Sequence, residues 1–251
     1  MNPQTTAFVL IFGSLLVPGM VSAQEPNFEA TLRLIDQRSN FQADLSATMS
    51  LETRDPAEGD ESRRVKMFRR DQDDLFLMLI EKPETQLGQG YLNVRDGLWF
   101  YDPESRQFTY TSRSESFEGS NANNEDFGAS ALADDYTVAG SSEGTLGDFA
   151  VWILELEAKN DEVTYPFKKI WVTKDDALLL KGEDYSLTKR LLRTSYYPSY
   201  TRAGESYIAD EMIFADALVE GKTTQIVLTD ISTSKIPDSV FTKAYVERVN
   251  R

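Results

Sequence analysis

The 251-residue chain contains no cysteine and no histidine. Without cysteine there is no disulfide framework, so a hydrophobic core must hold the fold together. Without histidine, Ser-His-Asp triads, Cys-His dyads and the usual zinc sites are excluded. The P-loop and the Gly-x-Gly-x-x-Gly fingerprint are also missing. We therefore expect a protein that is not an enzyme and that needs no metal or cofactor. A hydrolase that uses two carboxylates stays an alternative, although no acidic pair stands out among the 41 acidic residues.

Positive charge is scarce as well. The chain has 26 Lys and Arg against 41 Asp and Glu, which gives a formal net charge of −15. Such a surface repels phosphate backbones and anionic headgroups at long range. Nucleic acid is therefore not an expected partner, and the acidity is expected mainly to keep the protein soluble.

The segment Met1–Ala23 has no charged side chain. Its apolar run ends at a Pro-Gly break, and Val21-Ser22-Ala23 supplies the small residues that signal peptidase requires, which predicts cleavage after Ala23. A membrane anchor is the alternative, since the segment lacks the usual Lys or Arg, but the apolar run is shorter than the roughly 20 residues that a spanning helix needs. No cysteine follows for lipid attachment. We expect a periplasmic protein without a lipid anchor, with residues 24–251 as one domain.

The hydrophobic periodicity predicts a mainly β protein. A short helix is expected at Pro26–Asn40, and a second one closes the chain at Ser239–Val249. From Leu45 to Glu52 apolar and polar side chains alternate, which indicates a half-buried strand. Further strand segments are expected at Arg63–Arg70, Leu75–Glu81, Gly90–Val94, Leu98–Tyr101, Gln107–Thr111, Tyr136–Ala139, Phe149–Ala158, Phe167–Thr173, Leu178–Asp184, Leu191–Tyr197, Tyr207–Ala215 and Thr223–Asp230. From these we expect about 10–11 strands in one curved antiparallel sheet, mostly in meander order.

Two segments differ from the strand pattern. Ser112–Asp135 is long for a loop, is rich in Ser, Asn and Gly, and carries two isolated aromatic residues, Phe117 and Phe127, which suits a lid or a plug. The cluster Arg63–Arg70 concentrates five basic side chains in an acidic protein. It could bind an acidic partner or a headgroup, but a solvated face or a protected strand edge is the commoner role. The acidic turn Asp71–Asp74 lacks the Gly and the distant Glu of a calcium loop.

The aromatic residues are the most informative set. Most of them lie on expected strands, and a single sheet with few helices has too little helix to cover its concave face. The apolar side chains there must meet a lid, a partner or a ligand.

Four stretches resemble the LolA-like family of outer-membrane lipoprotein-sorting proteins. They are Leu79–Phe108 (LIEKPETQLGQGYLNVRDGLWFYDPESRQF), Ser116–Phe127 (SFEGSNANNEDF), Lys168–Ser186 (KKIWVTKDDALLLKGEDYS) and Val240–Val249 (VFTKAYVERV). The resemblance is to the broader family, because no motif matches that of an acyl-contacting arginine.

The resemblance implies a half-barrel whose concave face, covered by helices, holds a lipid or an acylated cargo. It implies a monomeric periplasmic carrier that works with a resistance-nodulation-division or MMPL-type exporter or with an outer-membrane acceptor. The alternative is an accessory protein that docks to such an exporter without lipid cargo. The residues expected to line the cavity are Leu77, Leu79, Leu92, Trp99, Tyr101, Tyr110, Phe117, Phe127, Trp152, Leu154, Trp171, Tyr185 and Phe214.

Overall fold

The computed structural model describes residues 27–95, 97–204 and 206–249. The predicted signal peptide lies outside the described residues. Among the helices within those ranges, none combines the length and the apolar character that a membrane span requires.

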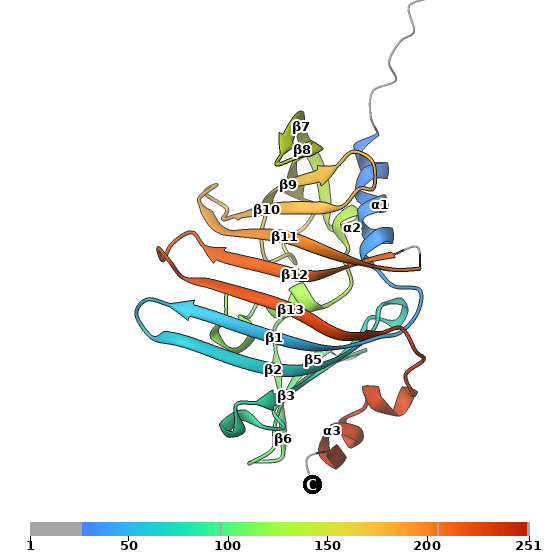
Figure 1. Ribbon diagram of the computed structural model, residues 1–251, viewed down its shortest axis with the longest axis vertical. Coiled ribbons are helices and arrows are strands. Elements are labelled where there is room, and N and C mark those ends of the chain that lie inside the picture. The colour runs from blue at the N-terminus through green and yellow to red at the C-terminus, as the bar shows by residue number, and fades with distance from the viewer. Residues whose placement is uncertain (1–26, 96, 205, 250–251) are drawn as a thin grey trace, which may run out of the picture.

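One antiparallel sheet of thirteen strands makes up most of the described chain (Figure 1). The strands are β1 (Leu45–Asp55), β2 (Gly59–Arg70), β3 (Leu75–Lys82), β4 (Gly90–Val94), β5 (Gly97–Asp102), β6 (Gln107–Thr111), β7 (Tyr136–Leu146), β8 (Phe149–Ala158), β9 (Phe167–Thr173), β10 (Leu179–Tyr185), β11 (Leu191–Ala203), β12 (Ser206–Asp216) and β13 (Thr223–Ser232). The mainly β prediction is confirmed. The expected count of about 10–11 strands is too low, because even the five-residue segments β4 and β6 pair as full strands.

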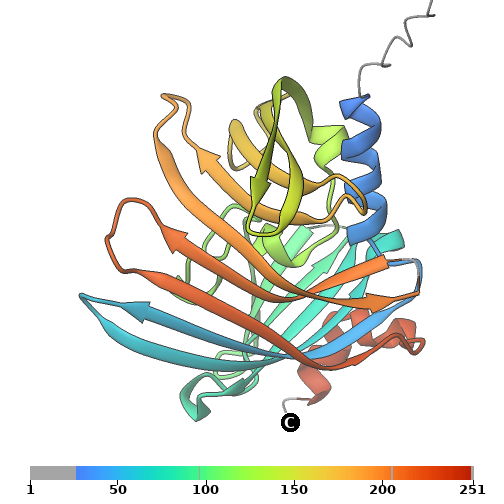
Figure 2. The same ribbon diagram turned by 45° about the horizontal axis from the view of Figure 1, so that its top comes forward.

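The strand order places the two ends of the meander at opposite edges. It runs β6-β5-β4-β3-β2-β1-β13-β12-β11-β10-β9-β8-β7, so β1 pairs with β13 in the middle of the sheet. The consecutive strands β6 and β7 are therefore the two edge strands. The segment that joins them, residues 112–135, must cross the whole concave face of the curved sheet (Figure 2). We call it the crossing segment. It contains the 3₁₀ turns η3 (Phe117–Gly119) and η4 (Asn124–Phe127) and the short helix α2 (Leu132–Asp135).

The main core lies between the concave face and the crossing segment. Alternate side chains of β1 to β4 and of β12 and β13 point into it, as the two-residue period requires. Phe117, Ala122 and Phe127 of the crossing segment are buried among them. The segment expected to act as a lid or a plug is thus packed as a plug.

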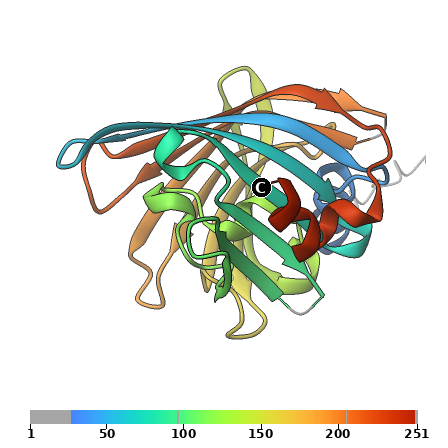
Figure 3. The same cartoon turned by 90° about the horizontal axis from the view of Figure 1, so that it is seen from below.

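Strand β3 is apolar on both faces because both faces are covered. Phe76, Met78 and Ile80 point into the main core, whereas Leu77 lies fully buried on the convex face. That face is covered by the 3₁₀ turn η5 (Asp238–Phe241) and the helix α3 (Lys243–Val249), which lie outside the sheet (Figure 3). The expected single helix Ser239–Val249 is therefore two short elements, with Thr242 in an extended conformation between them.

Helix α1 (Phe28–Ser39) covers the other end of the concave face. Its first turn is capped by the side chain of Asn27, which accepts a hydrogen bond from the backbone N–H of Ala30 at 3.1 Å, so the helix begins after the predicted start at Pro26. Leu32 and Ile35 are buried against β8 and β9.

Lys243 supports the covering of the convex face through an aromatic contact. Its Nζ lies 3.2 Å from the centroid of the Trp99 ring and 5.2 Å from that of Phe108. We expect Lys243→Gln to lower the free energy of unfolding by about 0.5–1 kcal/mol and to change the tryptophan emission spectrum, because the charge over the indole is lost. Urea denaturation followed by fluorescence measures both. The control is Lys66→Gln, which changes a lysine of β2 on the convex face and should leave the emission spectrum unchanged. An unchanged emission spectrum in Lys243→Gln would contradict the prediction.

Candidate functional site

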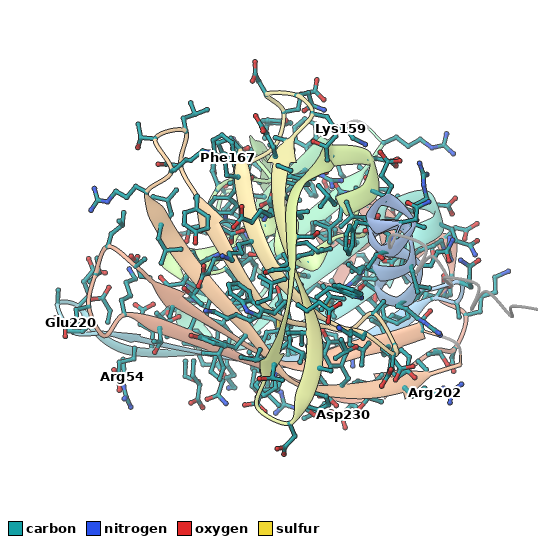
Figure 4. The ribbon with its side chains drawn as sticks, turned by 90° about the horizontal axis from the view of Figure 1, so that it is seen from above. Arg54, Lys159, Phe167, Arg202, Glu220 and Asp230 are labelled. Atoms are coloured by element: carbon teal, nitrogen blue, oxygen red, sulfur yellow. The ribbon has the colours of Figure 1, made fainter. Side chains whose placement is uncertain are left out.

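A cavity of about 700 Å³ lies on the concave face, between the sheet and the crossing segment. This volume falls within the ~300–1,000 Å³ that is typical of small-molecule sites. One side of the cavity is apolar and is lined by Phe41, Met67, Ile208, Met212 and Leu228. The loop 159–166 borders it as well; its first residue, Lys159, and the residue that follows it, Phe167, are labelled in Figure 4.

Five of the expected cavity residues do lie on the concave side of the sheet. Phe127 lines the cavity itself. Phe117 is fully buried, with its ring centroid 5.0 Å from that of Phe127, and fills the hollow over β3 and β4. Trp152 and Leu154 are covered by α1, and Phe214 is buried beneath the guanidinium of Arg193.

The other eight expected residues are placed on the convex face, away from the cavity. Five of them lie under the C-terminal elements. Leu77, Leu79, Leu92 and Tyr101 belong to the cluster under η5 and α3, and Trp99 lies under Lys243. Tyr110 pairs with Trp99 in the register and is 68% exposed. Trp171 lies beneath Lys181, and Tyr185 donates a hydrogen bond to Glu183 on the same outer face. These eight residues were expected on the cavity wall, and that expectation is wrong. Both faces of β3 to β6 and of β9 and β10 carry apolar side chains, so the sequence did not show which face lines the cavity.

The opposite side of the cavity is built from a buried ionic network. Arg193 on β11 binds Asp126 of the crossing segment at 2.6 Å and Asp184 of β10 at 2.8 Å. Lys168 on β9 binds the second oxygen of Asp184 at 2.7 Å. Burial opposes ionisation of Asp184, but the two cations outweigh it and hold the pKa of its carboxyl below the usual range. The network fastens the crossing segment to the sheet.

Two further carboxylates line the cavity, and the pKa of each is raised rather than lowered. Glu125 accepts a hydrogen bond from the Thr164 hydroxyl at 2.5 Å, and burial raises the pKa of its carboxyl. Burial also raises the pKa of Asp135, with a contribution from the neighbouring Asp134. Burial therefore makes the ionised form of each group less favourable than it is in water.

Glu125 is expected to make stability depend on pH. Its folded pKa lies above the ordinary 4.5, so this contribution is most favourable below that pH and is lost as the pH rises through the folded pKa. Glu125→Gln should consequently be more stable than the wild type at neutral pH, and the difference should close on acidification. Urea denaturation at several pH values measures this. Glu155→Gln, an exposed carboxylate, should show no such difference, and a loss of stability in Glu125→Gln at neutral pH would contradict the prediction.

Tyrosines complete the lining, and they are poor candidates for acid–base chemistry. The Tyr200 hydroxyl donates to the carbonyl of Leu179 at 2.5 Å, and that of Tyr136 donates to the carbonyl of Tyr165 at 2.9 Å. Burial raises the pKa of Tyr197 to about 12. In the described part of the chain, no group of three carboxylates is placed to hold a metal ion. The arrangement is suited to binding an amphiphile, with one apolar and one polar side.

Two arginines at the end of the basic cluster of β2 make internal contacts. Arg69 donates to the carbonyl of Gly128 at 3.0 Å and so holds the crossing segment. Arg70, on the other face, binds Asp238 at 2.7 Å and the carbonyl of Ile236 at 2.6 Å, which anchors the C-terminal elements. Alternation along the strand thus places Arg69 and Arg70 on opposite faces, where each holds a segment distant in sequence.

Sequence reasoning missed the polar residues of this site. Arg193, Asp184 and Lys168 were not singled out, because charged side chains on strands are usually exposed. Neither Asp184 nor Arg193 has apolar neighbours on both sides, because Glu183 precedes the first and Thr194 follows the second, so no local pattern marked them as buried.

Comparisons with known proteins agree with this architecture. A family model described as that of an uncharacterized protein matches residues 72–248. No curated protein matches the chain by sequence.

Three solved structures share the fold. A LolA superfamily protein from Nitrosomonas europaea is 24% identical, with a TM-score of 0.75, over 86% of this chain and 98% of its own. An outer membrane lipoprotein-sorting protein domain from Vibrio parahaemolyticus is 20% identical, with a TM-score of 0.78, over 88% and 98%. A DUF1329 family protein from Desulfovibrio piger is 20% identical, with a TM-score of 0.75, over 87% and 97%.

Proposed function

Because the chain belongs to the family of uncharacterized proteins whose model matches residues 72–248, and has a LolA-like fold, we propose that it is a non-enzymatic periplasmic carrier of an amphiphile with an acyl chain. The observation that carries the proposal is the cavity of about 700 Å³ on the concave face, apolar on one side and polar on the other. The sorting role named for the Vibrio domain supports a lipid or an acylated protein as cargo.

The energetics favour a carrier of this kind. Each methylene group removed from water contributes about 0.8 kcal/mol. Met67 and Met212 on the apolar wall have flexible, polarizable side chains that accommodate different chain shapes. Such a wall retains an acyl chain and still allows its release to a membrane exporter or an outer-membrane acceptor, which we propose as the partners.

Filling the cavity tests the proposal. Met212 lines the cavity, whereas the next residue, Ile213, pairs with Tyr196 on the outer face. We expect native mass spectrometry of the wild type to detect a bound amphiphile, and the delipidated protein to rebind dodecanol in calorimetry. Met212→Trp should abolish rebinding, and Ile213→Trp, the matched control, should retain it. A wild type that neither retains nor rebinds any amphiphile would rule out the carrier.

A second candidate function has its own observation in favour. Phe117 and Ala122 of the crossing segment fill part of the hollow, as an accessory protein that docks to an exporter without lipid cargo would require. The same variant separates the two candidates in a binding experiment with membranes. A Met212→Trp variant that still binds an exporter from detergent-solubilised membranes as the wild type does, with no lipid in either protein, would favour docking.

A further inference from the structure

The cationic side chains that line the cavity are already engaged by carboxylates. The pairs are Lys168–Asp184, Arg193–Asp126, Arg69–Asp71 and Arg113–Asp74. In the first two pairs all four side chains are at least four-fifths buried. A ligand carboxylate or phosphate that bound Lys168 or Arg193 would displace a protein carboxylate and leave it buried without a partner, which is costly. The cavity is therefore a poor site for an anionic headgroup.

The carboxylates of the cavity are not all balanced in this way. Within the described residues, neither Glu125 nor Asp135 has a cation within ion-pair distance, although both line the cavity. Burial raises the pKa of both groups, although the charge of Lys168 lowers it in part, so their ionised forms carry a net cost. At the border of the cavity the exposed side chains of Asp161 and Glu162 add further negative charge. A cationic group in the cavity would offset that cost.

Two aromatic residues of the cavity lining also favour a cationic ligand group. Tyr197 and Tyr200 both line the cavity, and in the described part of the chain no Lys or Arg is stacked on either ring. Ring faces attract ammonium groups by about 0.5–2 kcal/mol, and more strongly in a site shielded from water. Two features, carboxylates without an ion pair and tyrosine rings without a stacked cation, thus favour a positively charged ligand group.

We propose that the cavity selects amphiphiles whose polar end is an amine, and that Glu125 receives the ammonium group. The acyl part would lie against the apolar wall at Ile208 and Met212, on the far side of the cavity from Lys168. The inference rests on the proposed function, because it needs the cavity to hold an amphiphile, and it adds the charge of the headgroup.

Three ligands of equal chain length test it: dodecylamine, dodecanol and dodecanoate, each titrated below its micelle concentration into the delipidated full chain at neutral pH. We expect the amine to bind at least about tenfold more tightly than the carboxylate, with the alcohol between them. Glu125→Gln should weaken amine binding about tenfold and leave alcohol binding unchanged. Glu155→Gln, which removes an equal charge from an exposed position, is the matched control and should bind all three ligands as the wild type does.

The possible results separate the preference for amines from the carrier function. Carboxylate binding as tight as amine binding, or an amine preference that survives Glu125→Gln, would overturn the inference and leave the carrier intact. An equal loss of amine binding in Glu125→Gln and Glu155→Gln would also overturn it, because net charge alone would then explain the preference. Failure of all three ligands to bind the wild type would overturn the inference and the carrier together.

Discussion

Arg193→Met is expected to lower the free energy of unfolding by about 3–5 kcal/mol, because it leaves buried carboxylates without their counter-ion. Asp126 and Asp184 both bind this guanidinium, and the side chain of Arg193 is only 7% exposed. The variant should also lose protection of the crossing segment, since Arg193 binds the backbone carbonyl of Asn121 at 3.2 Å. Urea denaturation measures the first effect and amide hydrogen exchange the second.

A double variant shows whether charge is the cause. Arg193→Met combined with Asp126→Asn removes the carboxylate that the single variant leaves without a cation, while Lys168 continues to neutralise Asp184. We expect the double variant to recover at least about 1 kcal/mol of the loss. A double variant less stable than Arg193→Met would show that packing, rather than an unpaired carboxylate, accounts for the effect.

The network also predicts the acid limb of the stability profile. The folded pKa of Asp184 lies below its ordinary value of 3.8. Its stabilising contribution is therefore complete above that pH and is lost as the pH falls through the folded pKa. Arg193→Met should reduce this acid dependence.

Phe117→Ala is the second large expected effect, with a loss of about 3–5 kcal/mol in the free energy of unfolding. The ring is fully buried, and its centroid lies 4.8 Å from that of Tyr91 and 5.0 Å from that of Phe127. Truncation removes these contacts and leaves a void, which the neighbours cannot fill because Met78 and Ile80 are fixed on a central strand.

An exposed aromatic residue provides the comparison. Tyr110→Ala, at a side chain that is 68% exposed, should cost less than about 1 kcal/mol. Equal losses in the two variants, measured by urea denaturation, would mean that the crossing segment does not plug the hollow in solution.

The sequence was sufficient for the strands and for the kind of sheet. Alternation in β1 and the Asp-Gly turn before β5 are local signals, and local signals determine where a strand begins and ends. The long edge strand β7 shows the limit. Only Tyr136–Ala139 was expected, but the strand continues to Leu146 through Gly140-Ser141-Ser142, because an edge strand with two solvated faces needs no apolar alternation.

Which face a side chain occupies was harder to predict. Leu77 and Met78 are equally apolar, yet they lie on opposite faces, and both are buried because the chain's C-terminal elements cover the convex side. Trp171 illustrates the same difficulty on β9, where it lies outside beneath Lys181 while Ile170 faces the hollow. Whether a face of the sheet is buried depends on which distant segments of the chain pack against it. The pattern of residues within one strand carries no information about those segments.

The pairing of β1 with β13 has a consequence for how the chain acquires its structure. The hydroxyls of Thr53 and Thr224 meet at 3.0 Å across this seam, although they are 171 residues apart. Closing so long a loop precedes any gain from the contacts it makes, and such topologies fold slowly. Until β13 has been synthesised, β1 presents an unpaired edge in the middle of the future sheet, and such edges promote aggregation. Completion of the whole sheet therefore depends on β13, and the seam favours keeping the nascent polypeptide unfolded until β13 has been synthesised.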